Sequence, residues 1–178
     1  LKYQLIFRTW GDKNESDFPI EFVKAWRDLE ITPVITWEPW KRDLNKNSRG
    51  IVQPEYSLKS ISEGKHDDYI KNWAKEAKES NIPIIVRFAH EQSTQLGVTV
   101  TYPWRGDPNG FKKAYQRIYN IFKSEGANNV QFMWSPLAYW PDVLNQYYPG
   151  DGYVDVIGLS VLNHGVNVGE PGNRWKMC

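Results

Sequence analysis

Short apolar runs alternate with amphipathic segments along this chain, and that alternation limits the folds it can adopt. Five runs are β-branched and continuously apolar, which is typical of strands buried in a parallel sheet. Between them, apolar residues recur three and four positions apart, as on one face of a helix. The predicted strands are residues 3–8, 33–37, 82–88, 130–134 and 153–159.

The segments between the runs predict helices. Asp17, Asp67 and Asp107 stand at the expected starts of three of them, and Pro108 takes the first helical position of the third. A short fourth helix is expected around residues 143–147, and a long polar stretch covers residues 41–65. The apolar stripes, with Trp26 and Trp73 assigned to the core, are Phe22, Val23, Trp26 and Leu29; Ile70, Trp73, Ala74 and Ala77; and Phe111, Ala114, Tyr115, Ile118 and Phe122.

This alternation indicates an α/β fold in which helices cover a parallel sheet, either a doubly wound open sheet or a (β/α)8 TIM barrel. No G-x-G-x-x-G or G-x-x-x-x-G-K follows the first run, so the phosphate-cradling motifs are absent. The strands end instead in large aromatic and polar residues, which a barrel gathers around one central site. We therefore expect a barrel.

The chain is short for that fold. A (β/α)8 barrel needs eight strands and about 250 residues, whereas this chain has 178 residues and five predicted strands. We expect residues 1–178 to form a partial barrel of about five βα units, with two open parallel edges.

Composition excludes several classes of function. A formal net charge of +1 without a basic block gives no footprint for nucleic acid. No window approaches the roughly 18 consecutive apolar residues of a membrane span, and the lone Cys178 cannot form an internal disulfide. The unusual feature is nine Trp, ten Tyr and seven Phe, which can fill a core or stack on sugars.

His90 and Glu91 follow the third predicted strand directly, at the end where a barrel places its active site. A carboxyl group there could act as a general acid, although an isolated Glu more often pairs with a cation such as Arg87 or Arg8. Glu38 occupies the equivalent position after the preceding strand. Two carboxyls about 5–5.5 Å apart would indicate a retaining glycosidase, and a separation near 6.5–9.5 Å an inverting one.

Rival chemistries have weaker signals. His90 and His164 could share a metal, but no H-E-x-x-H occurs, and we expect none to be bound. A serine triad lacks the G-x-S-x-G elbow. Aromatic residues past the strand ends favour a groove for a polysaccharide chain. They are Trp10, Trp37, Trp40, Tyr102, Trp104, Trp134, Tyr139 and Trp140.

Six motifs in order along the chain resemble glycoside hydrolase family 26, the β-mannanase-like family of retaining (β/α)8 enzymes. They are T-W-E-P-W at Thr36–Trp40; the pattern G-x-Y-D-x-Y-I-x-x-W-A, matched here from Gly64 to Ala74 with His66 in place of its Tyr; R-x-x-H-E at Arg87–Glu91; Y-P-W at Tyr102–Trp104; N-V-x-x-x-W-S-P at Asn129–Pro136; and Y-P-G-D-x-x-V-D-x-I-G at Tyr148–Gly158.

The resemblance implies an endo-acting β-glycanase that cuts mannan, glucan or xylan by double displacement, without a cofactor, outside the cell. It makes Glu91 the acid/base and reduces Glu38 to a scaffold or subsite residue. The nucleophile is then a Glu on the seventh strand, beyond this chain, so the five strands become numbers two to six and the chain alone is inactive. His90 would position the substrate or the nucleophile, and the substrate-binding set is His90, Trp37, Trp40, Tyr102, Trp104, Trp134 and Asn163.

The chain also departs from the family pattern. It reads H-E-Q-S-T at residues 90–94 where the family usually has H-E-M-N-G, so Ser93 replaces an Asn near the acid. Leu162 stands where a tyrosine usually contacts the nucleophile. These changes keep open a non-catalytic polysaccharide-binding or accessory domain on the same fold. A further alternative is a different clan-related hydrolase or an unrelated (β/α)8 enzyme.

Overall fold

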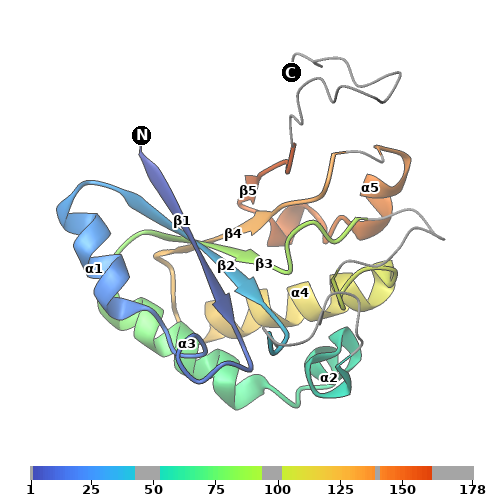
Figure 1. The fold of residues 1–178 in the computed structure, drawn as a ribbon, viewed down its shortest axis with the longest axis horizontal. Helices are drawn as coiled ribbons and strands as arrows, with labels where there is room; N and C mark the ends of the chain where they lie inside the picture. Colours follow the sequence, from blue (N-terminus) through green and yellow to red (C-terminus); the bar gives the residue numbers. More distant parts are fainter. Residues whose placement is uncertain (1, 43–52, 94–101, 139–140, 162–178) are drawn as a thin grey trace.

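Five parallel strands form one sheet in the order β1-β2-β3-β4-β5 (Figure 1). The computed structural model describes residues 2–42, 53–93, 102–138 and 141–161. The strands are β1 (Tyr3–Thr9), β2 (Thr32–Glu38), β3 (Ile84–Phe88), β4 (Val130–Trp134) and β5 (Val156–Ile157). Their order never reverses, as it would in a doubly wound sheet. The predicted partial barrel is therefore confirmed.

Helices follow the strands and cover one face of the sheet (Figure 1). The α-helices are α1 (Ile20–Asp28), α2 (Leu58–Ser62), α3 (Asp67–Ser80), α4 (Pro108–Ser124) and α5 (Pro141–Tyr147), with 3-10 turns η1 (Pro54–Tyr56) and η2 (Asp151–Tyr153).

Two of the helix signals behave as predicted and one does not. The Asp107 side chain accepts a hydrogen bond from the Gly110 amide (2.8 Å), which caps α4 in front of Pro108. Asp67 begins α3 as expected. The prediction for Asp17 is wrong, because α1 begins later, after Pro19, and has no side-chain cap.

The sequence reading missed α2 within the polar stretch. Its start is capped by the Ser57 hydroxyl, which accepts from the Ser60 amide, and it is held by buried Leu58 and Ile61. Five residues are too few to show a helical period, so only the cap could have revealed it.

The fifth strand is shorter than predicted. The turn η2 takes up residues 151–153, and the Asp155 carboxylate accepts from the Phe132 amide (2.8 Å). Backbone hydrogen bonds beyond β5 still join this segment to the end of β4 and the residues after it. Gly158 N donates to the Trp134 oxygen and Ser160 N to the Pro136 oxygen (both 3.0 Å).

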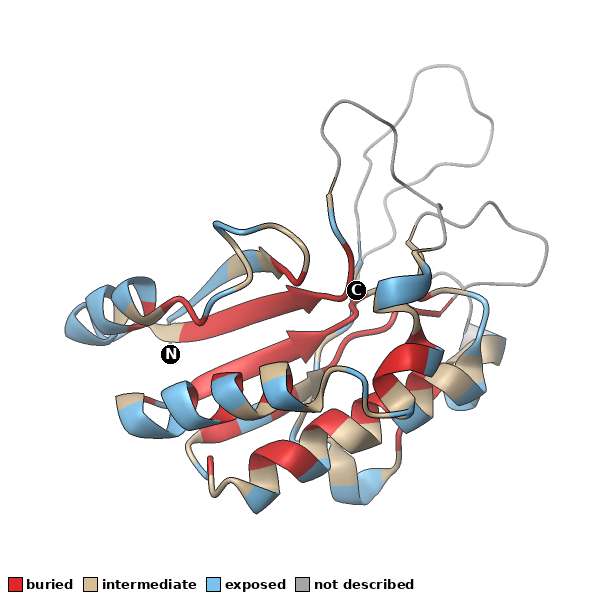
Figure 2. Cartoon of the chain, turned by 90° about the horizontal axis from the view of Figure 1, so that it is seen from below, coloured by how far each residue is buried: buried red, intermediate tan, exposed pale blue. Residues whose placement is uncertain are grey.

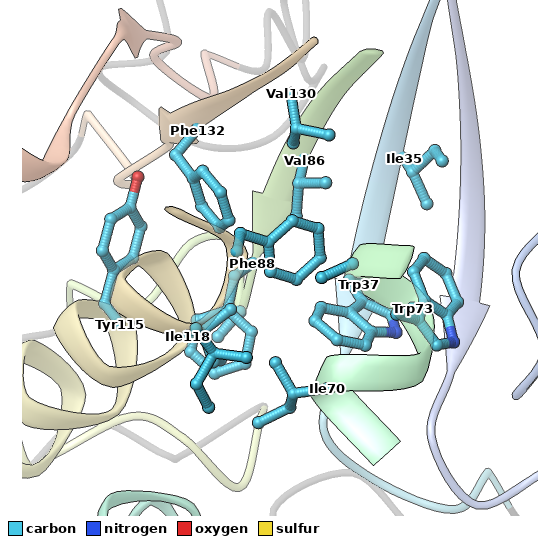
Figure 3. Packing of buried hydrophobic residues seen from close by; sticks show 14 of the residues in the cluster. Ile35, Trp37, Ile70, Trp73, Val86, Phe88, Tyr115, Ile118, Val130 and Phe132 are labelled. Carbon is cyan, nitrogen blue, oxygen red and sulfur yellow. The ribbon is translucent and has the colours of Figure 1, made fainter. Parts of the chain in front are cut away.

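The core lies between the sheet and helices α3 and α4. Strand residues that point toward the helices, such as Trp37 and Phe88, meet the predicted stripes of α3 and α4 (Figure 3). The stripe of α1 is only partly confirmed: Val23 is fully buried, but Phe22 and Leu29 are 50% and 62% exposed. Buried residues gather in the central strands and on the helix faces turned toward them (Figure 2).

The opposite face of the sheet is the inner face of the barrel. It is an open hollow of about 590 Å³, lined by β1 residues Tyr3 and Leu5 and by inward-pointing residues of the other strands. Tyr3, Leu5 and Phe7 are 54%, 38% and 43% exposed. Within the described ranges, no helix is long and apolar enough to cross a bilayer.

Candidate active site

The carboxyl ends of β1, β2, β3 and β4 meet at one rim of the arc, where a barrel carries its chemistry. The register pairs Thr9 with Glu38 and Thr36 with Arg87. Because side chains alternate between the two faces of a strand, Thr36, Glu38 and Arg87 point into the barrel. The rim therefore gathers the polar residues that the sequence placed at strand ends.

His90 lies in a strained turn directly after β3. Ala89 and Glu91, on either side of it, have left-handed φ angles of 46° and 53°, which cost a residue with a Cβ roughly 1 kcal/mol or more each. Backbone bonds to both neighbouring strands hold the turn: Ala89 N donates to the Trp37 oxygen (3.0 Å) and Glu91 N to the Ser135 oxygen (2.7 Å).

The His90 ring is buried and neutral. Burial, then the positive charges of Arg87 and Arg105, lower its pKa from 6.5 to about 3. Its Nε2 lies 3.2 Å from the Tyr102 hydroxyl. Its Nδ1 is 3.7 Å from Glu38 Oε1, and since the ring carries no charge this approach is not an ion pair.

The Glu91 side chain lies at the rim and is 19% exposed. It pairs with Arg105, whose side chain is almost fully buried. Arg105 Nη2 donates to Glu91 Oε2 (3.2 Å), and Arg105 Nε donates to the Glu91 main-chain oxygen (2.7 Å). Sequence reasoning considered Arg87 and Arg8 as partners and missed Arg105. Its position directly after the Y-P-W motif was the available signal.

Glu38 is a scaffold residue in this structure. Its carboxylate is buried and accepts from Trp40 Nε1 (3.2 Å) and Arg42 Nη2 (3.1 Å). Burial raises the pKa of Glu38 more than these hydrogen bonds lower it. Arg42 also approaches Glu15 (3.8 Å), so the cation is shared between two carboxylates.

Arg87 crosses the inner face and ties three segments together. Its guanidinium donates to the hydroxyls of Ser135 (2.8 Å), Thr36 (3.2 Å) and Ser160 (2.7 Å). Burial lowers its pKa, while the charges of Glu91, Tyr102 and Glu38 act in the opposite direction. Arg87 therefore links β2 and β3 to the segments that follow β4 and β5.

Three of the predicted groove aromatics come together beside His90. Tyr102 stacks on Trp104 with ring centres 4.7 Å apart, and Trp40 meets both rings edge-on at 5.8 and 5.6 Å. Trp40 and Trp104 are almost fully buried, whereas Tyr102 is half-buried and covers Trp104. Tyr102 is therefore the least buried ring of this cluster, and the Arg105 guanidinium lies over it, 4.9 Å from the ring centre.

Two predicted groove residues lie on the wrong side of the sheet for that role. Trp37 is fully buried and stacks on Trp73 of α3 with ring centres 4.4 Å apart (Figure 3). Trp134 is 6% exposed and packs against Tyr148. Both prefer the helix-facing core because strand alternation points them away from the barrel interior. In this structure their side chains pack in the helix-facing core and not toward the barrel interior.

Trp10, also predicted for the groove, is 5% exposed and packs in the core against Trp37 and Phe88. Four other predicted residues lie outside the described residues, namely Asn163, His164, Tyr139 and Trp140. In the part of the chain that the structure does describe, no group of three His, Cys, Asp or Glu side chains could hold a metal ion.

Comparison with known proteins places the chain in a family. The sequence pattern of glycosyl hydrolase family 26 matches residues 35–172. Endoglucanase H of Acetivibrio thermocellus is 30% identical over 155 residues, which are 80% of this chain and 15% of that protein. A beta-1,3-xylanase from a Vibrio species is 26% identical over 108 residues, which are 58% of this chain and 22% of that protein.

A solved structure shows the same fold. The modular endo-beta-1,4-mannanase from Cellulomonas fimi superposes with a TM-score of 0.68 at 17% identity, over 89% of this chain and 41% of that chain. The chain thus spans well under two thirds of each of these relatives.

Proposed function

The chain belongs to glycosyl hydrolase family 26, and we propose that it carries the acid/base side of the active site of an endo-acting β-glycanase. The substrate is a β-linked polysaccharide built on mannose, glucose or xylose. The names of the similar proteins, an endoglucanase and a xylanase, support this range. Because such polymers lie outside the cytoplasm, the enzyme acts outside the cell or at its surface.

Glu91 is the residue on which the proposal depends. It protonates the leaving glycosidic oxygen while a second carboxylate attacks the anomeric carbon, and it then deprotonates the water that releases the sugar. The supporting observation is its place at the barrel rim, at the end of β3, partly exposed and held by Arg105. His90 stays neutral beside it and positions substrate, and Tyr102 provides a stacking face.

The nucleophile comes from outside this chain. We propose that β1 to β5 are strands two to six of the barrel and that the nucleophilic Glu stands on strand seven. The share of the Cellulomonas fimi structure that is covered, 41%, supports a partial domain. The isolated chain is then inactive, and the reaction, which needs two carboxylates only, uses no cofactor.

The departure at Ser93 favours a second candidate, a polysaccharide-binding domain without catalysis. The Ser93 hydroxyl bonds both the oxygen and the amide of Leu137 (3.1 and 3.0 Å) and is fully buried. It therefore offers no group to a sugar in place of the family's usual Asn. A Glu at the end of strand seven in the full-length protein supports the enzyme, and Ala, Ser or Gln there supports the binder.

The test is Glu91→Gln in the full-length protein, with Glu63→Gln, an exposed carboxylate beside α2, as matched control. Because general acid catalysis contributes about 10²–10⁴-fold, we expect kcat on the polysaccharide to fall by at least about 100-fold while binding persists. The control should keep its full rate. An unchanged rate for Glu91→Gln would remove the assignment.

A further inference from the structure

The segment Tyr102–Arg105 holds the His90–Glu91 turn through side chains only. The Tyr102 hydroxyl meets His90 Nε2 (3.2 Å), and Trp104 Nε1 donates to the His90 main-chain oxygen (2.8 Å). Arg105 adds its two bonds to Glu91, one to the main-chain oxygen and one to the carboxylate. This segment therefore contacts the His90 ring, the main-chain oxygens of His90 and Glu91, and the Glu91 carboxylate.

Arg105 is built into its position. Its side chain is 5% exposed, and its guanidinium lies over the Tyr102 ring, 4.9 Å from the ring centre. Charge-assisted bonds from a planar, forked donor fix direction as well as distance. A lysine could supply the charge and several donors, but all from one nitrogen on a flexible stem, so it does not reproduce the geometry of the two bonds.

The neighbours of Glu91 do not provide this control. Gln92 and Ser93 are both fully buried. With its amide oriented to satisfy both ends, Gln92 donates to the Ser135 oxygen (3.1 Å) and accepts from Trp134 (2.6 Å). Ser93 bonds Leu137. Both side chains hold the loop after β4 rather than the carboxylate. In the described part of the chain, the ion pair to Glu91 comes from Arg105.

We propose that Arg105 is a positioning residue, which holds the Glu91 carboxyl in the orientation needed for proton transfer to the leaving oxygen. The inference rests on the proposed function of Glu91. A left-handed residue at the end of a strand is free to relax unless it is held, and a displacement of about 1 Å at a catalytic group can cost about 100-fold in rate. Arg105 therefore acts on kcat through Glu91, without touching the substrate.

The experiment is a double-mutant cycle in the full-length protein, using Glu91→Ala, Arg105→Lys and the combination, measured on polysaccharide. Arg105→Lys alone should lower kcat by roughly 10- to 100-fold with little change in KM. In the Glu91→Ala background it should have no further effect, because residues that act as a unit are not additive. With a dinitrophenyl glycoside, whose leaving group needs little protonation, the same variant should form the glycosyl-enzyme at a nearly normal burst rate. Hydrolysis of that intermediate should be slower, because it needs Glu91 as the base.

Arg117→Lys is the matched control, because Arg117 on α4 also makes a forked contact, to both carboxylate oxygens of Asp67 on α3 (2.7 and 2.6 Å), and neither residue belongs to the candidate site. It should lower the melting temperature and leave kcat unchanged. Arg105→Gln, checked for its melting temperature, replaces Arg105→Lys if that variant does not fold.

Three outcomes would overturn the inference: a normal kcat for a folded Arg105 variant, a loss that adds fully to that of Glu91→Ala, or a burst rate on the dinitrophenyl glycoside that falls as much as kcat on polysaccharide. If Glu91→Ala itself turns over normally, the proposed function fails instead, so the two failures are distinguishable.

Discussion

At the scale of single residues, side-chain alternation decides which aromatics face the site. Trp37 and Glu38 are neighbours at the end of β2, yet the Trp37 side chain enters the helix-facing core and the Glu38 side chain points into the barrel. A position at the end of a strand places a residue near the rim but does not say which face of the sheet its side chain is on. A shift of one residue along the strand moves the side chain to the other face. Stacking candidates must therefore be chosen by parity along the strand as well as by residue type.

This separation predicts different effects for two aromatic variants of the full-length protein. Trp37→Phe leaves a gap against Trp73 and should lower the free energy of unfolding by about 1–3 kcal/mol while KM stays constant. Tyr102→Ala should raise KM, because Tyr102 is the proposed sugar contact and the least buried ring of the cluster beside His90. Denaturant unfolding and steady-state kinetics on both variants check this, and a KM effect confined to Trp37→Phe would reverse the assignment.

His90 gives a pH-dependent prediction. Its pKa falls from 6.5 in the unfolded chain to about 3 in the folded one. As pH drops below 6.5 the unfolded chain binds a proton that the folded chain does not, so the free energy of unfolding decreases toward pH 3. Melting curves of the wild type and His90→Gln between pH 4 and 8 should converge on acidification. Parallel curves would show that His90 titrates normally.

At the scale of elements, local signals identified those that are long or strongly capped. Helices α3 and α4 follow the sequence pattern closely because their apolar periodicity runs over several turns, and Asp107 also caps α4. Strand β4 has the predicted bounds. Helix α2 was missed since its five residues carry a cap but no period. The turn at Ala89 and Glu91 was also beyond local signals, because neither residue favours left-handed φ and tertiary bonds impose it.

The cap of α4 gives the prediction at this scale. Asp107→Ala removes the bond to the Gly110 amide and should cost about 1 kcal/mol of stability. Asp107→Ser keeps an acceptor at the cap and is the control. Thermal unfolding of the three proteins measures the difference. Equal melting temperatures for Ala and Asp would show that Pro108 alone determines the start of the helix.

At the scale of the whole molecule, the inner face of the sheet distinguishes a partial barrel from a complete domain. Leu5 points into the hollow and is 38% exposed in this chain. If strands from outside the chain close the barrel, Leu5 is buried in the full-length protein. The five-strand arc itself followed from the sequence, but its exposure could be seen only in the structure, because inward and outward positions look equally apolar in the runs.

Leu5→Gln should therefore destabilise the full-length protein by about 1–3 kcal/mol, since it buries an amide in an apolar interior. The same change in the isolated chain should cost less than about 0.5 kcal/mol, as at an exposed site. Denaturant unfolding of both pairs gives the comparison. An equal cost in the two contexts would contradict closure of the barrel over this face.

Azide rescue of Glu91→Ala in the full-length protein tests whether Glu91 is the acid/base of a retaining glycanase. A dinitrophenyl β-glycoside forms the glycosyl-enzyme without the acid, and azide can attack it without a base. Azide should restore turnover, and the product should be the β-configured glycosyl azide. An α-configured azide, or no azide product and no gain in rate, would contradict it.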